Sequence, residues 1–296
     1  MKSVSKTNKK RPSYEINSPF RYPGGKFYAR KLILEHVPPH STYIEPFCGG
    51  GSIFFAKSKA QRNILNDKDE ELVNCYINIR DNPNELADIL EGYPANKETH
   101  AFFKNDYKPN NDLERAARWF YLNRTSYSGI MKMENCYFGY GDEYSMQPKN
   151  WRRHLNKTSR KLQGVEIYNK DFQSIIDNAP DGSFLFIDPP YFNRDQDKFY
   201  TPVFTKEDHK RLCETLKHNG NRLKFLLTYD NEEEIREMYS WANEVMDKEW
   251  FYTINRTDDQ TKGKNGAVKT PNGKRYKGKE IFIINYESPS SQLNKS

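Results

Sequence analysis

The amino-acid sequence predicts an α/β protein with a doubly wound, mostly parallel sheet and one inserted helical segment. Short apolar runs alternate with helical spacing over residues 42–80, which is typical of a βαβ unit. A near-continuous apolar run at residues 224–229 is typical of a parallel strand buried on both faces. Residues 83–160 are instead polar and rich in aromatic side chains, which indicates an insertion.

The first third of the chain supplies the start of the sheet. Expected here are helices at residues 29–37, 53–57 and 70–80 and strands at residues 42–45 and 63–66. Pro38 and Pro39 end the first helix, and Ser52 is the expected N-cap of the second. The second strand ends at Asp67, so a glycine-rich loop and an acidic residue follow successive strands.

The rest of the chain completes the alternation. We expect helices at residues 84–90 and 113–122 within the insertion, strands at 165–168, 183–188 and 224–229, and helices at 207–218 and 232–241. Residues 250–254 and 281–284 are expected to form a closing pair of strands. The segment between them, 255–279, carries eight basic and two acidic residues, which favours contact with a polyanion over an ordinary solvated loop.

Composition excludes several classes of protein. The 296 residues are 35% hydrophobic with a formal net charge of +7, which suits a folded domain with wide solvated surfaces and is compatible with nucleic acid. The four cysteines are far apart without a CxxC pair, which argues against a zinc or dithiol site. No secretory leader or apolar run of about 20 residues is visible. We therefore expect a cytoplasmic protein with reduced thiols and no metal.

The loop at residues 45–51, Glu-Pro-Phe-Cys-Gly-Gly-Gly, lies between a strand and a helix. Glycines there let the backbone turn tightly and approach a ligand closely. A cofactor in this position would sit outside the carboxyl ends of the strands, where Asp67 could bond ribose hydroxyls. The alternative is a connector with a solvated aspartate.

The segment Asp188-Pro189-Pro190-Tyr191 also follows an apolar strand. Its two prolines stiffen the backbone and remove two N–H donors, which leaves a carboxylate, a carbonyl and an aromatic ring. These groups suit an amino-bearing planar ring: Asp188 and the Pro189 carbonyl accept from the exocyclic amine, and Tyr191 stacks on the ring. The alternative is a rigid turn at the end of a strand.

Taken together, these motifs resemble those of the Dam-like N6-adenine DNA methyltransferases, the D12 class. The Pro-Gly-Gly-Lys turn at 23–26, the glycine loop, the Asn66-Asp67 end of the second strand and the Asp-Pro-Pro-Tyr segment occur in the family's order, in the alpha arrangement. The resemblance extends over residues 18–286. It implies a methyltransferase fold, S-adenosylmethionine as cofactor, and methyl transfer to N6 of an adenine flipped out of double-stranded DNA.

The resemblance also implies roles for individual residues. The methionine side of the cofactor is expected to meet Tyr22, Gly25, Lys26, Pro46, Phe47, Gly49 and Gly51. Asp67 is expected at the ribose, and Asp171 and Phe172 at the adenine of the cofactor, with Asp188 facing both cofactor and target. The expected catalytic residues are Asp188, Pro189, Pro190 and Tyr191. Asp171 has the alternative role of a helix N-cap, and Lys26 that of a surface lysine.

Residues 123–129 resemble the start of the family's DNA-reading hairpin. The expected DNA contacts are Arg21, Arg124, Tyr127, Ser128 and Lys132. After this point the sequence departs from the Phe-Asn-Val-Pro-Phe-Gly-like stretch of members that modify GATC, which puts GATC in doubt. For Arg124 and Lys132 a merely solvated charge is an equal alternative.

The resulting interpretation divides the chain into a disordered basic tail (1–17), a catalytic domain (18–82 and 161–296) and a target-recognition insertion (83–160). Three alternatives remain: an N4-cytosine DNA methyltransferase, an enzyme that methylates glutamine side chains or RNA, and a non-catalytic DNA-binding relative. The expected partner is double-stranded DNA. We expect a monomer, with a dimer and a companion restriction endonuclease left open.

Overall fold

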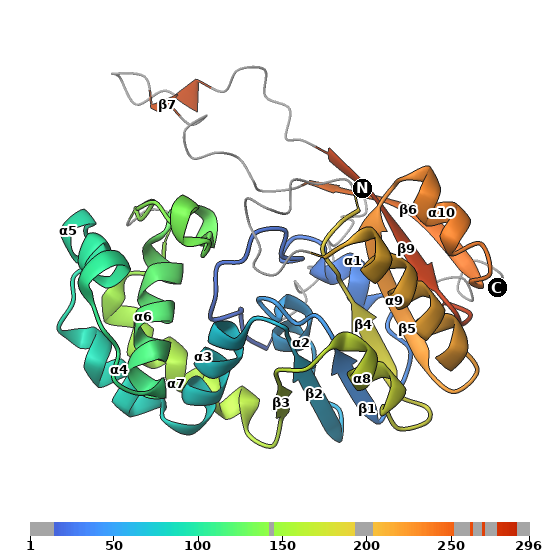
Figure 1. Ribbon diagram of the computed structural model, residues 1–296, viewed down its shortest axis with the longest axis horizontal. Coiled ribbons are helices and arrows are strands. Elements are labelled where there is room, and N and C mark those ends of the chain that lie inside the picture. The colour runs from blue at the N-terminus through green and yellow to red at the C-terminus, as the bar shows by residue number, and fades with distance from the viewer. Residues whose placement is uncertain are drawn as a thin grey trace, which may run out of the picture.

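The computed structural model describes residues 15–141, 145–192, 204–251, 261–262, 268–269 and 277–288. Within them, a seven-stranded sheet has the order β3-β2-β1-β4-β5-β9-β6 (Figure 1). Its strands are β1 (Thr42–Glu45), β2 (Arg62–Asn66), β3 (Glu166–Tyr168), β4 (Phe184–Ile187), β5 (Lys224–Asp230), β6 (Glu244–Phe251) and β9 (Lys277–Ile284). Strands β1 to β5 pair in parallel, and β9 runs antiparallel between β5 and β6. The predicted doubly wound, mostly parallel sheet is confirmed.

Helices cover both faces of the sheet (Figure 1). One face packs against α8 (Phe172–Asp177), α9 (Lys206–Asn219) and α10 (Glu233–Met238), and the other against α1 (Arg30–Leu34), α2 (Ser52–Ala56) and α3 (Glu70–Asp81). Successive strand residues point to opposite faces, so Leu226 and Leu227, both fully buried, belong to different cores. Burial on both faces explains the continuous apolar runs of these strands.

The insertion is a helical layer beside the sheet (Figure 1). It contains α4 (Pro83–Glu91), α5 (Lys97–Ala101), the π-helical turn η1 (Phe102–Asp106), α6 (Asp112–Thr125), α7 (Trp151–Leu162) and the 3-10 turns η2 (Tyr127–Gly129), η3 (Met133–Asn135) and η4 (Pro148–Asn150). Its apolar side chains share a core with α3: the Phe20 ring lies 4.7 Å from both the Tyr76 and Trp119 rings. The insertion is thus packed against α3, which lies between it and the sheet (Figure 1).

The local predictions need correction in several places. Helix α2 begins at Ser52 with Gly51 as N-cap, so Ser52 is not the cap. The reason is the tight turn before the helix, which needs the left-handed backbone of Gly51 (φ 63°). Strand β6 begins at Glu244, six residues before the predicted start, because charged residues on this edge strand hide its pattern. Helices α5 and α7 were not predicted.

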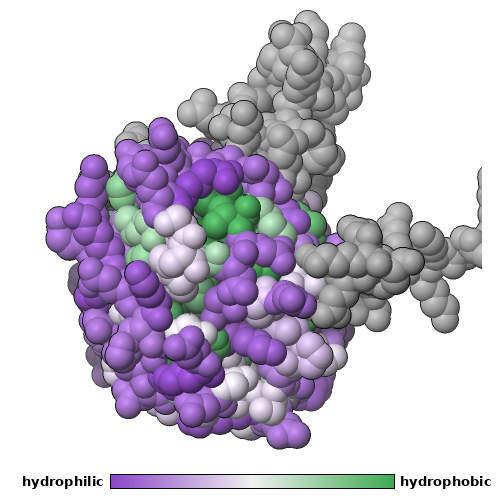
Figure 2. Space-filling view, turned by 90° about the vertical axis from the view of Figure 1, so that its right-hand side faces the viewer, coloured by the Kyte–Doolittle hydropathy of each residue, from purple (hydrophilic) through white to green (hydrophobic). Residues whose placement is uncertain are grey.

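The surface agrees with the polar composition. Figure 2 shows hydrophilic side chains over most of the side that carries α9 and α10. All four cysteines are free and buried, as expected for structural thiols. No helix in the described part of the chain is long and apolar enough to cross a membrane. Most of the basic tail and most of the basic segment 255–279 lie outside the described residues; the latter contributes β7 (Thr261–Lys262) and β8 (Val268–Lys269).

Candidate functional site

The glycine loop connects β1 to α2 and depends on two left-handed residues. Gly49 has φ 45° and Gly51 has φ 63°, and the Gly51 N–H donates to the Cys48 carbonyl at 2.6 Å. A Cβ atom on Gly49 would lie 2.8 Å from the Tyr22 ring, and one on Gly51 would lie 2.9 Å from the Phe55 ring. Both positions therefore exclude a side chain, and the loop keeps its backbone open toward the space in front of it.

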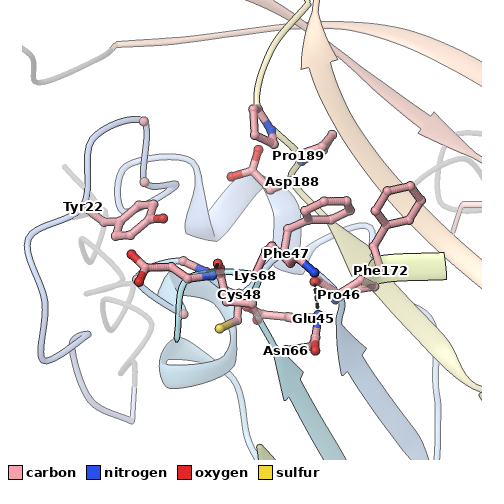
Figure 3. A pocket seen from close by; sticks show the side chains of 18 of the residues that line it. Tyr22, Glu45, Pro46, Phe47, Cys48, Asn66, Lys68, Phe172, Asp188 and Pro189 are labelled. Carbon is pink, nitrogen blue, oxygen red and sulfur yellow. Dashed lines mark hydrogen bonds between the residues drawn. The ribbon is translucent and has the colours of Figure 1, made fainter. Parts of the chain in front are cut away.

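The end of β2 holds this loop in place. Asp67 accepts from the Gly49 N–H at 2.8 Å and from the Asp69 N–H at 3.0 Å. The Asn66 side-chain amide donates to the Pro46 carbonyl at 2.9 Å, which Figure 3 shows, and to the Lys170 carbonyl at 3.0 Å. Asn66 and Asp67 thus join the loop after β1 to the segment after β3.

One cavity of about 330 Å³ brings the two predicted motifs together. It is lined by the turn at residues 22–26, the loop at 45–51, Asp67, and the segment 188–191. Asp171 and Phe172 line it as well, as do Trp119, Gly129 and Met131 from the insertion. In Figure 3, Tyr22 lies on one side and the Phe47 and Phe172 rings on the other, with Asp188 and Pro189 above the loop. All residues predicted to contact the cofactor or the reacting base therefore line one cavity.

At one end of the cavity lies an aromatic and ionic cluster. The Phe47 and Phe172 rings stack with centroids 5.2 Å apart. Asp171 is the N-cap of α8, as the alternative suggested, because it accepts from the Gln173 N–H at 3.0 Å. Arg211 donates to both oxygens of Asp171, at 2.6 and 3.0 Å, and its guanidinium lies 4.2 Å from the Phe172 ring. This ion pair lowers the pKa of Asp171 and keeps the carboxylate charged.

At the other end, Asp188 lies in a charged cluster. Its Oδ1 atom accepts from the Lys26 ammonium at 2.6 Å and from the Thr228 hydroxyl at 2.7 Å. Lys26 is 3% exposed, lies 3.9 Å from the Glu280 carboxylate and stands 4.9 Å from the Tyr191 ring centroid. Lys26 is therefore a buried residue of the site, and its partner in this structure is Asp188.

Burial sets the electrostatics beneath the loop. It raises the pKa of Glu45 to about 8, although the Tyr43 hydroxyl and the Phe54 N–H both donate to this carboxyl group. Burial also raises the pKa of Asp69 to about 6, and the charge of Asp67 adds to that effect. Glu45 is thus largely protonated at neutral pH.

The predicted DNA contacts lie beside the cavity. Arg21 donates to the Ser126 carbonyl at 3.0 Å and so ties the segment after the tail to the insertion. Arg124 is 6% exposed, and burial lowers its pKa to about 10. This position does not favour direct contact with DNA, and we assign Arg124 to packing. Ser128 has φ 53°, and Tyr127 and Lys132 are half-buried along the same segment.

Sequence reasoning missed several residues of the site. Thr228, Glu280 and Arg211 come from β5, β9 and α9, far from the recognised motifs. A partial signal existed for Thr228, which is a polar residue inside an apolar strand. Nothing in the sequence pairs Glu280 with Lys26, because they are 254 positions apart and only the fold brings them together.

The residues present fit a nucleoside. Gly49 and Gly51 leave backbone exposed where a Cβ atom would intrude, and carboxylates follow β2 and β3 where sugar and base hydroxyl or amino groups can donate. The apolar rings of Phe47 and Phe172 supply a surface for a base.

A family model described as D12 class N6 adenine-specific DNA methyltransferase matches residues 22–254. This range includes the glycine loop, the insertion and the proline motif. The match therefore covers most of the chain.

Curated relatives show the same likeness. Type II methyltransferase M1.LlaDCHI of Lactococcus lactis subsp. cremoris is 26% identical over 90% of this chain and 94% of its own. Type II methyltransferase M.CviBI of Paramecium bursaria Chlorella virus NC1A is 30% identical over 74% of this chain and 85% of its own. The DNA N-6-adenine-methyltransferase of Escherichia phage P1 is 30% identical over 80% of this chain, which spans only 33% of that longer protein.

Proposed function

The chain belongs to the D12 class of N6 adenine-specific DNA methyltransferases, and from this premise we propose that it methylates N6 of an adenine flipped out of double-stranded DNA. The family expected from the sequence motifs is thereby confirmed, and membership in this methyltransferase family supports S-adenosylmethionine as the cofactor. A base inside a duplex is inaccessible to a cavity of this kind, so the target adenine has to leave the stack.

The placement of Asp188 is the observation that carries the proposal. Lys26 and Thr228 both donate to Oδ1, which fixes the carboxylate and leaves Oδ2 available to the cavity. Pro189 has no backbone N–H, so this segment presents acceptors and no competing donor at this position. The Asp188 carboxylate and the Pro189 carbonyl can therefore each accept one hydrogen of an exocyclic amine. Tyr191 lines the same cavity and can pack on the adenine ring.

The chemistry follows from this arrangement. S-adenosylmethionine supplies an electrophilic methyl group on a positively charged sulfur. When bound, the cofactor would supply its methyl carbon to the N6 lone pair, the electrons of the carbon–sulfur bond would stay on sulfur, and the amine would release one proton to solvent. Asp188 and the Pro189 carbonyl orient the amine so that its lone pair points at the methyl carbon. The carboxylate also stabilises the positive charge that develops on N6.

On the cofactor side, we assign the methionine part to the glycine loop and to residues 22–25 of the preceding turn. Asp67 lies where it can accept from ribose hydroxyls, and it also holds Gly49. Asp171 and Phe172 are assigned to the adenine of the cofactor. Because Lys26 pairs with Asp188, we now assign Lys26 to the target side and no longer to the methionine side of the cofactor.

We further propose that the insertion reads the DNA sequence. Its residues Gly129 and Met131 line the cavity, so the adjacent segment 126–138 is placed to meet the DNA around a flipped base. The basic segment 255–279, with eight basic residues, is proposed to contact phosphates. The division at residues 83 and 160 stays a prediction.

Double-stranded DNA is the proposed partner, in the cytoplasm of a bacterial, archaeal or phage-infected cell. The relatives named type II methyltransferases support a companion restriction endonuclease as a further proposal. The competing functions are N4-cytosine methylation of DNA, methylation of RNA or of glutamine side chains, and DNA binding without catalysis.

Transfer of a labelled methyl group tests the activity. Purified protein is incubated with cofactor carrying a tritiated methyl group and with duplex DNA, RNA or protein in parallel. The proposal predicts label in duplex DNA alone. Label in RNA or protein, or none in any acceptor from folded protein that binds the cofactor, would contradict it.

A further inference from the structure

Lys26 lies between two carboxylates that come from different strands. Its Nζ atom is 2.6 Å from Asp188 Oδ1 at the end of β4 and 3.9 Å from Glu280 Oε2 on β9. Lys26 is 3% exposed and Glu280 is fully buried. Charges taken out of water in this way interact strongly, and removing one member leaves the others uncompensated. The cluster therefore acts as a unit.

The fold gives Glu280 a fixed place in this cluster. Glu280 pairs in register with Asp230 on β5 and with Lys248 on β6, so these three side chains share one face of the sheet. Thr228, two residues before Asp230 on the same strand, points to that face and donates to Asp188. The cross-strand cation Lys248 lies 3.1 Å from the Nε2 atom of His36, so its ammonium is directed toward α1 and its connection.

We propose that Glu280 is a positioning residue of the methyl-transfer site: it holds the Lys26 ammonium against Asp188, so that Asp188 presents its second oxygen to the target amine. This inference rests on the proposed function of the cavity. Lys26 alone would neutralise Asp188. With Glu280 nearby, the Lys26 ammonium is shared between two carboxyl groups, so it offsets less of the charge of Asp188, which faces the nitrogen that becomes positive during transfer.

The test compares Glu280→Gln with Glu280→Asp and with Glu166→Gln, a control on the distant strand β3. Single-turnover methyl transfer is measured at saturating cofactor and DNA, and the dissociation constant of the cofactor is measured by calorimetry. We expect Glu280→Gln to slow transfer at least tenfold while the cofactor dissociation constant stays within twofold. Glu280→Asp should recover most of the rate, and Glu166→Gln should match the wild type.

A transfer rate of Glu280→Gln within twofold of the wild type would overturn the proposal. So would a rate loss matched by an equal weakening of cofactor binding, because that pattern indicates a general structural role. An inactive wild-type protein would instead contradict the proposed function. In that case the coupling between Lys26 and Glu280 is tested without an activity assay. A double-mutant cycle of Lys26→Met and Glu280→Gln is measured by the thermal midpoint of unfolding, and strictly additive losses would overturn the coupling.

Discussion

The Asp188 side chain has two roles, which different measurements on one variant can separate. It orients the target amine, and it neutralises a buried lysine. We predict that Asp188→Asn abolishes methyl transfer and leaves the cofactor dissociation constant nearly unchanged. It should also lower the free energy of unfolding by a few kcal/mol, because Lys26 loses its nearest carboxylate. Calorimetry, a label assay and urea unfolding measure the three quantities. Turnover near the wild-type level would remove Asp188 from the catalytic role; Asp181→Asn, on an exposed turn, serves as control.

Glu45 provides a pH-dependent prediction. Its pKa in the folded protein is about 8, raised by burial above the ordinary value of 4.5. The folded protein therefore binds the proton more tightly than the unfolded chain, so the contribution of Glu45 to stability is full below pH 4.5 and falls as the pH rises toward 8. A difference of one pKa unit corresponds to about 1.4 kcal/mol.

Glu45→Gln should therefore remove part of the loss of stability between pH 5 and pH 8, since the amide oxygen can accept from Tyr43 and Phe54 but carries no titrating proton. Urea unfolding at several pH values, for wild type and variant, measures the difference. The two proteins should converge at low pH and diverge as the pH rises. Parallel pH profiles would show that Glu45 does not titrate in this range.

The individual site residues were predictable to the extent that they belong to contiguous motifs. The segment 45–51 and the segment 188–191 follow strands, and parallel strands bring their carboxyl ends to one edge. The sequence could not reveal which charged side chains form ion pairs with each other. The pairing of Lys26 with Asp188, and of Asp171 with Arg211, depends on side chains brought together from separate elements.

At the scale of elements, a substitution in the loop between β1 and α2 tests whether the backbone shape of this loop is needed for cofactor binding. Gly49→Ala places a Cβ atom 2.8 Å from the Tyr22 ring at a left-handed backbone. Gly182→Ala is a matched control, because Gly182 also has positive φ but nothing lies within 4 Å of its added Cβ. We predict that both lose about 1 kcal/mol of stability from backbone strain. Gly49→Ala should in addition weaken cofactor binding at least tenfold by calorimetry. Equal cofactor affinity in the two variants would contradict a binding role for the loop.

The elements that the sequence predicted well are those with clear periodicity. Strands β4 and β5 have continuous apolar runs, and β1 and β2 have buried apolar centres, so their patterns are strong. The edge strand β6 carries Glu244, Asp247 and Lys248, which obscured its beginning. Helix α7 contains only three large apolar residues among its twelve, so its pattern was easily missed even though Trp151 and Leu155 are fully packed.

For the whole molecule, the basic segment 255–279 should set the affinity for DNA without choosing its sequence. Replacing Lys262, Lys264, Lys269 and Lys274 by glutamine should weaken binding to all duplexes alike. Each lost phosphate contact should flatten the slope of log affinity against log salt by about 0.9. Replacing Lys210 and Lys217, exposed on α9, is the control. An unchanged slope would exclude the segment from phosphate binding, and an altered modified sequence would make it a reader of bases.

The central claim is that the cavity lined by residues of both the insertion and the sheet is a site for methylation of adenine N6 in DNA. Nucleoside mass spectrometry of DNA from a methylation-free host that expresses the protein tests this claim most directly. The account predicts N6-methyldeoxyadenosine with the wild-type protein and none with Asp188→Asn. N4-methyldeoxycytidine in its place, or unmodified DNA in the presence of folded wild-type protein, would contradict it.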